Sequence, residues 1–169
     1  VYYWLENDGA YPLSCTIRLK FPKQQNLPAF DLYWYDGGMK PFAPEELEMD
    51  NSDIDPEGMM FVGTSGKILA GFQGENPRLI PESRMTDRSS IDSSNIDRGH
   101  HTWVDSVMKK ELSPGSFQRA RTITDTVNLA AIALRADKKV DFDPDLMKIT
   151  NDAAANAYLS REDRPGWEF

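Results

Sequence analysis

Residues 127–135 read Val-Asn-Leu-Ala-Ala-Ile-Ala-Leu-Arg, followed by Lys-Lys-Val-Asp-Phe-Asp at 138–143 and Met-Lys-Ile-Thr-Asn at 147–151. The first stretch predicts a helix that begins near Ile123, where Thr122 and Asp125 form a capping box. Helical spacing directs one set of apolar side chains inward: Ile123, Val127, Ala130, Ala131 and Leu134. The basic residues after this helix suit the negative pole of its dipole. A helix, a basic turn and a short Asp/Phe strand therefore organise the end of the chain.

Strand patterns dominate the chain before this helix. Apolar and polar residues alternate from Leu13 to Phe21, and an aromatic strand is predicted over 30–36. Residues 59–62 and 67–71 form a predicted hairpin joined at 63–66, and 78–81 is a further short strand. Residues 41–58 form a loop with one helical turn around 45–49, and 86–98 form a second loop. A helix is predicted over 101–110, stopped by Ser-Pro-Gly at 113–115.

This order of early strands and late helices predicts an α+β domain with a predominantly antiparallel, open-faced sheet and helices on one face. The 169 residues suit one domain and can bury a core. The single cysteine, Cys15, excludes an internal disulfide, and its place in an alternating strand predicts a small buried apolar residue.

Charge limits the classes of partner. The formal net charge is −8, which argues against nucleic acid and against an anionic membrane surface as partners. No apolar run has the length of a membrane span. The chain starts at Val1 without a methionine, which we expect of a domain cut from a longer protein. A cytoplasmic location is favoured, and a periplasmic one stays open because the native N-terminus can lie upstream.

Two glycine-containing or acidic segments mimic ligand-binding motifs. The chain has no Gly-x-Gly-x-x-Gly, and Gly-Thr-Ser-Gly-Lys at 63–67 is too short for a phosphate-binding loop and lies between strands. The acidic stretch 53–58 resembles a calcium loop, but it contains Pro56 and has Thr64 where such loops need glutamate. We interpret it as a solvated acidic loop.

The two histidines, His100 and His101, are candidate substrate ligands. They are adjacent, so on a helix their side chains point in different directions. His101 and Asp105 could share a face as a metal pair, but a third ligand is missing nearby, so we predict no metal site. A histidine at the start of this helix can hydrogen-bond a sugar-like molecule, or it can simply be satisfied by loop carbonyl groups.

The strand Tyr33-Trp34-Tyr35-Asp36 is the sharper candidate. Alternation puts Trp34 and Asp36 on one face and the two tyrosines on the other. An exposed aromatic ring beside a hydrogen-bonding group suits a polyol or sugar ring, so Trp34 and Asp36 are predicted to bind substrate. A core aromatic pair with a polar turn residue is the alternative.

The tail mixes guanidinium and aromatic groups. It contains Arg161, Arg164 and Trp167. We expect Trp167 to pack back onto the domain and one of the arginines to form an ion pair.

The order of these motifs resembles the C-terminal end of Gfo/Idh/MocA-type oxidoreductases, and the bacterial dehydrogenase-type members are the most similar. The resemblance rests on the helix at 127–135, the Asp/Phe strand, the Thr-Asn pair at 150–151 and the ending Pro-Gly-Trp-Glu-Phe at 165–169. Upstream, Tyr-Trp-Tyr-Asp-Gly-Gly at 33–38, Pro-Glu-Glu-Leu at 44–47 and Phe-Val-Gly-Thr-Ser-Gly-Lys-Ile at 61–68 extend it. It covers nearly the whole chain.

The resemblance implies that 1–169 is the C-terminal substrate and oligomerisation domain of an NAD(P)-dependent oxidoreductase that acts on a sugar or polyol. It implies that the nucleotide-binding Rossmann domain and the principal catalytic residues lie outside this chain, so no catalytic residue is assigned here. The fragment itself is expected to bind no cofactor and to be inactive, with NAD or NADP bound by the full-length parent. A histidine near 100–101 approaches the substrate pocket in the family, and the open sheet face serves for substrate and for subunit pairing, which implies a homodimer or homotetramer. The alternatives are a non-catalytic carbohydrate-binding module and a structural dimerisation domain.

Overall fold

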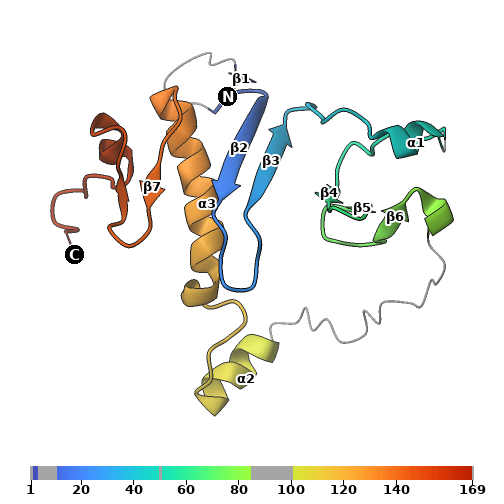
Figure 1. The fold of residues 1–169 in the computed structure, drawn as a ribbon. Coiled ribbons are helices and arrows are strands. Elements are labelled where there is room, and N and C mark those ends of the chain that lie inside the picture. The colour runs from blue at the N-terminus through green and yellow to red at the C-terminus, as the bar shows by residue number, and fades with distance from the viewer. Residues whose placement is uncertain (1, 4–10, 50, 85–100, 169) are drawn as a thin grey trace. The chain divides into compact units, whose positions relative to one another are not determined.

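The computed structural model describes residues 2–3, 11–49, 51–84 and 101–168 (Figure 1). The chain divides into two compact units, one made of 1–34 with 98–169 and the other of 35–97.

One sheet has the strand order β1-β2-β3: Tyr2–Tyr3, Cys15–Phe21 and Phe30–Asp36. All of it lies in the first unit except the last two residues of β3, which begin the second unit. β1 pairs antiparallel with β2, and β2 and β3 run in opposite directions as a hairpin (Figure 1). The predicted alternation in β2 is confirmed, because Cys15 and Ile17 are buried while Arg18 and Lys20 are exposed. Burial of Cys15 as a small apolar residue is confirmed as well.

The long helix α3 (Phe117–Ala136) covers one face of β2. Leu134 packs with Cys15 and Ile17, and the partly buried Leu19 and Ala130 extend this core. The face of β2 that carries Arg18 and Lys20 is turned away from this helix, because neighbouring side chains on a strand alternate between faces. This arrangement confirms the α+β class predicted for the chain.

The start of α3 differs from the prediction. The helix begins at Phe117, and Ser116 is its N-cap, with the side-chain oxygen accepting a hydrogen bond from Arg119 N at 3.4 Å. The predicted capping box at Thr122 and Asp125 is wrong, since both residues lie inside the helix. Ser116 already satisfies one of the free N–H groups at the helix start, so no second cap is needed downstream.

The predicted inward face of α3 is confirmed only in its second half. Leu134 is buried, whereas the side chains of Ile123 and Val127 are 70% and 63% exposed. The early turns of α3 therefore do not pack against the described core residues that bury its second half. On another side of α3, Ile132 enters a second core with Ile149 and Ala155, a contact that the single predicted stripe did not include.

This second core packs the C-terminal segment of the chain against α3. The hairpin of β7 (Phe142–Asp143) and β8 (Lys148–Ile149) pairs Phe142 with Ile149, and the 3-10 helix η3 (Ala154–Tyr158) packs on β8 and on α3. Asn156 fixes η3 to β8, because its side chain accepts from Ile149 N at 2.9 Å and donates to Ile149 O at 2.9 Å. The short Asp/Phe strand predicted from the sequence is confirmed.

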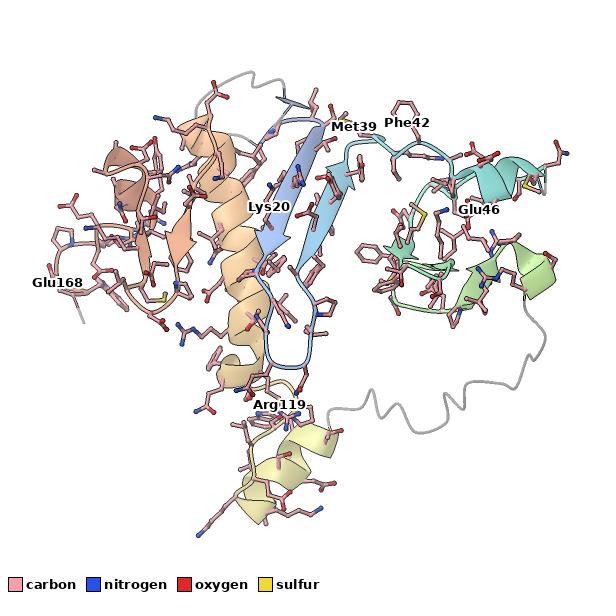
Figure 2. All side chains as sticks on the ribbon, viewed as in Figure 1. Lys20, Met39, Phe42, Glu46, Arg119 and Glu168 are labelled. Carbon is pink, nitrogen blue, oxygen red and sulfur yellow. The ribbon has the colours of Figure 1, made fainter. Side chains whose placement is uncertain are left out.

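The second unit holds the antiparallel sheet β4-β5-β6: Met59–Val62, Lys67–Ala70 and Arg78–Ile80. The predicted hairpin is confirmed, with Val62 opposite Lys67 and Gly63 N donating to Gly66 O at 2.9 Å across the turn. The helical turn α1 (Glu45–Met49) is confirmed too, and its Leu47 is fully buried. An ion pair between Lys67 and Glu46, which is labelled in Figure 2, joins α1 to β5.

Two further elements complete the described chain. The 3-10 helix η1 (Glu82–Arg84) follows β6, and α2 (His101–Lys109) agrees with the helix predicted there. The loop predicted over 86–98 lies outside the described residues. None of the described helices combines the length and apolar character that a bilayer span requires.

Candidate functional site

The strand β3 carries two of the residues predicted to bind substrate, Trp34 and Asp36. The indole of Trp34 is 47% exposed and the side chain of Asp36 is exposed. Asp36 Oδ1 accepts a hydrogen bond from Gly37 N at 2.8 Å, which holds the carboxylate at the end of the strand. Oδ2 can then accept from a ligand hydroxyl. The alternative that Trp34 is a buried core aromatic is wrong, because nearly half of its surface is open.

Contacts across the hairpin show which face of β3 carries Trp34. The rings of Phe21 and Phe30 stack with centroids 4.7 Å apart. Phe21 has the same strand parity as Cys15 and Ile17, which pack against α3. Phe30 and Trp34 therefore lie on the side of the sheet that faces the helix, and α3 leaves this part of β3 uncovered.

The opposite, helix-free face holds a cluster that the sequence reasoning missed. Arg18 donates from Nε to Asp31 Oδ2 at 3.1 Å, and its guanidinium lies 5.5 Å from the centre of the Tyr33 ring. The hydrogen bond to Asp31 raises the pKa of Arg18 above its ordinary value. Polar residues at alternate positions of two strands joined by a hairpin are the signal that could have revealed this cluster.

The chemistry of the two faces differs. The Trp34 face offers an aromatic ring and a carboxylate, which can stack on the C–H face of a sugar and accept its hydroxyl hydrogens. The Arg18 face presents a neutralised ion pair with a tyrosine ring, and arginine and tyrosine are among the residues enriched where protein surfaces meet. Lys20, one position further on the same face of β2, adds a cation (Figure 2).

The role of the two histidines as substrate ligands remains a prediction. His100 lies outside the described residues, and His101 is the first residue of α2, with only its backbone described. Among the described residues, no three His, Cys, Asp or Glu side chains gather closely enough to hold a metal ion.

The glycines of the β4–β5 turn do not fit a dinucleotide. Gly63 and Gly66 join two antiparallel strands, whereas a pyrophosphate is held where a strand turns directly into a helix. This turn therefore lacks the strand-to-helix geometry of a phosphate-binding loop.

The tail differs from what we expected. Trp167 is 63% exposed, and its backbone N donates to Arg164 O at 2.9 Å within a local turn. The prediction that this indole packs back onto the domain is wrong, because the Pro-Gly turn before it keeps the contact local.

Comparison with known proteins identifies the kind of domain that this chain forms. A family model described as "Oxidoreductase family, C-terminal alpha/beta domain" matches residues 1–169, the whole of the chain. Searches among curated proteins and among solved structures found no match.

Proposed function

Because this chain belongs to the Gfo/Idh/MocA oxidoreductase family, as its C-terminal domain, we propose that it binds the substrate and mediates oligomerisation in an NAD(P)-dependent oxidoreductase. The substrate class that we propose is a sugar or polyol. The reaction of the whole protein is then reversible: a hydride passes between a hydroxyl-bearing carbon and the nicotinamide, and the hydroxyl proton leaves to a base.

The observation that carries the substrate proposal is the exposed Trp34 beside Asp36 on β3. A sugar ring has a C–H face that stacks on indole and a rim of hydroxyl groups that donate to a carboxylate. Binding in this way needs a half-open aromatic ring, because a buried ring has no free face and a fully exposed one gives the ligand no second contact.

NAD or NADP is assigned in this proposal to a nucleotide-binding domain outside the chain. The described residues that could imitate a phosphate loop, Gly63 and Gly66, sit in a hairpin and do not fit. We expect calorimetric titration of the 169-residue chain with NAD or NADP to release no binding heat. Saturable binding at micromolar concentration would count against the assignment of the cofactor to a domain outside the chain.

Subunit pairing is assigned to the helix-free face of the β2–β3 hairpin. Arg18 and Asp31 already neutralise each other there, so a second copy can cover them at a smaller desolvation cost than two unpaired charges would carry. A two-fold axis through this face gives a homodimer, and a second axis gives a homotetramer.

The test uses the full-length parent enzyme and a panel of sugars and polyols. Trp34→Ala and Asp36→Asn are expected to raise KM by about tenfold or more, the effect of losing one charge-assisted contact or one ring face. Trp167→Ala is the matched control, since Trp167 is similarly exposed but lies in the tail. Wild-type KM in both β3 variants, with melting temperatures unchanged, would remove this strand from the substrate site. Sugar binding without turnover would favour the carbohydrate-binding module.

A further inference from the structure

A pocket in the second unit is lined by none of the residues assigned above to substrate binding or subunit pairing. It has a volume of about 450 Å³ and is open to solvent at the β4–β5 turn. Its polar wall is formed by Thr64, Ser65 and Arg84, and its apolar wall by Ile68 and Leu79. This volume falls within the range of small-molecule sites, although the pocket is shallow, because the side chains of both walls are exposed.

Arg84 is held in place beside the turn. Its Nη1 donates to Ser65 O, which fixes one edge of the guanidinium to the turn. A Cβ built on Gly66 would lie 3.0 Å from that Nη1 and 3.7 Å from Cζ, so a larger residue at this position would push the guanidinium aside. A guanidinium has five N–H donors, and the Ser65 contact uses one of the two on Nη1.

The apolar wall comes from two neighbouring strands. Ile68 on β5 stands directly opposite Leu79 on β6, and both side chains are exposed. Cross-strand partners of this kind form a continuous apolar surface. The other cations of these two strands are paired with carboxylates, Lys67 with Glu46 and Arg78 with Glu82.

We propose that this pocket binds a small molecule that bears a carboxylate on an apolar body. The carboxylate accepts hydrogen bonds from the Arg84 guanidinium, whose planar fork matches a carboxylate, and from the Thr64 and Ser65 hydroxyls. The apolar body covers Ile68 and Leu79. None of the β3 residues lines this pocket, so this site stands independently of the sugar or polyol site.

The test is an NMR titration of the ¹⁵N-labelled 169-residue chain with benzoate, its neutral isostere benzamide, and inorganic phosphate. Benzoate is expected to shift the amide signals of 63–66 and the Nε signal of Arg84 saturably at millimolar concentration. Benzamide is expected to leave them in place, because it lacks the charge that the guanidinium recognises.

Variants distinguish benzoate binding in this pocket from a general attraction of the anion to exposed cations. Arg84→Gln is expected to weaken benzoate binding about tenfold, the value of a charge-assisted contact, and Gly66→Ala to weaken it less by displacing the guanidinium. Arg119→Gln, an exposed arginine at the start of α3 (Figure 2), is the matched control and should bind as wild type. Equal shifts with benzamide, tighter binding of phosphate than benzoate, or unchanged binding in Arg84→Gln would each overturn the proposal.

Discussion

Lys138 Nζ lies 2.8 Å from Asp152 Oδ2, which ties the basic turn after α3 to the segment before η3. The Asp152 side chain is only 14% exposed. The hydrogen bond from Lys138 holds the pKa of Asp152 below its ordinary value, and the same bond raises the pKa of Lys138. The basic residues predicted to serve the helix dipole therefore also hold the last hairpin in place.

This ion pair gives stability a defined pH dependence. A lowered folded-state pKa means that Asp152 stabilises the fold above its unfolded pKa, and that this contribution disappears as the pH falls through the folded value. The raised pKa of Lys138 means that its contribution is complete at neutral pH and is lost only in strong alkali. Asp152→Asn is expected to lower the melting temperature at neutral pH and to melt like wild type in strong acid.

Thermal scans by circular dichroism across the acidic range test this expectation. Asparagine keeps an oxygen that can accept from Ala154 N, so the substitution removes the charge and little else. Asp141→Asn is the control, because its pair with Lys139 is far more exposed and is expected to matter less. A melting difference that persists unchanged into strong acid would contradict the assignment to charge.

Asn156→Ala is expected to destabilise the first unit by about 2–3 kcal/mol. The side chain of Asn156 bonds both backbone groups of Ile149, a residue that is almost fully buried, so alanine leaves a buried N–H unpaired. Urea unfolding measures the change. Asn128→Ala on the exposed side of α3 is the matched control and should stay within about 0.5 kcal/mol of wild type. Equal stability of the two variants would mean that Asn156 does not clasp β8.

Gly58→Ala is expected to destabilise the second unit by about 2 kcal/mol or more. Gly58 has φ 155°, and a Cβ there would lie 2.7 Å from Ala70 O, a backbone atom that cannot move aside alone. Gly115→Ala offers the comparison, because nothing lies within 4 Å of its Cβ position. Proteolysis within 35–84, followed by mass spectrometry, should report faster cleavage in Gly58→Ala only. Matching cleavage rates would rule out a tight approach of Ala70 to Gly58.

The chain is expected to form a dimer or a dimer of dimers in solution through the helix-free face. Tyr33→Glu should produce monomers, because it replaces the ring over Arg18 with a carboxylate that must lose its hydration when a second copy covers that face. Arg119→Glu, on α3, should leave the assembly unchanged. Multi-angle light scattering at high micromolar concentration decides, and a monomer mass for the wild-type chain would exclude pairing through this face.

Local pattern was sufficient for most elements of the fold. The strand over 30–36 and the hairpin around 63–66 were predicted with their observed bounds or close to them, since alternation and glycine turns are local signals. The start of α3 was not predicted correctly, because Ser116 and Thr122 are both acceptable caps by residue type. In the structure Ser116 caps the helix.

At the candidate sites, the difference between what local pattern predicts and what packing decides is larger. Alternation by itself determined that Trp34 and Asp36 share a face of their strand, and the motif order by itself determined the family. Only the tertiary structure decided that this face is the helix side, that Arg18 reaches Asp31, and that Arg84 reaches Ser65. The physical reason is that a strand pattern is symmetric between its two faces. Contacts between residues far apart in the chain break that symmetry, and they form only when the strands and helices pack.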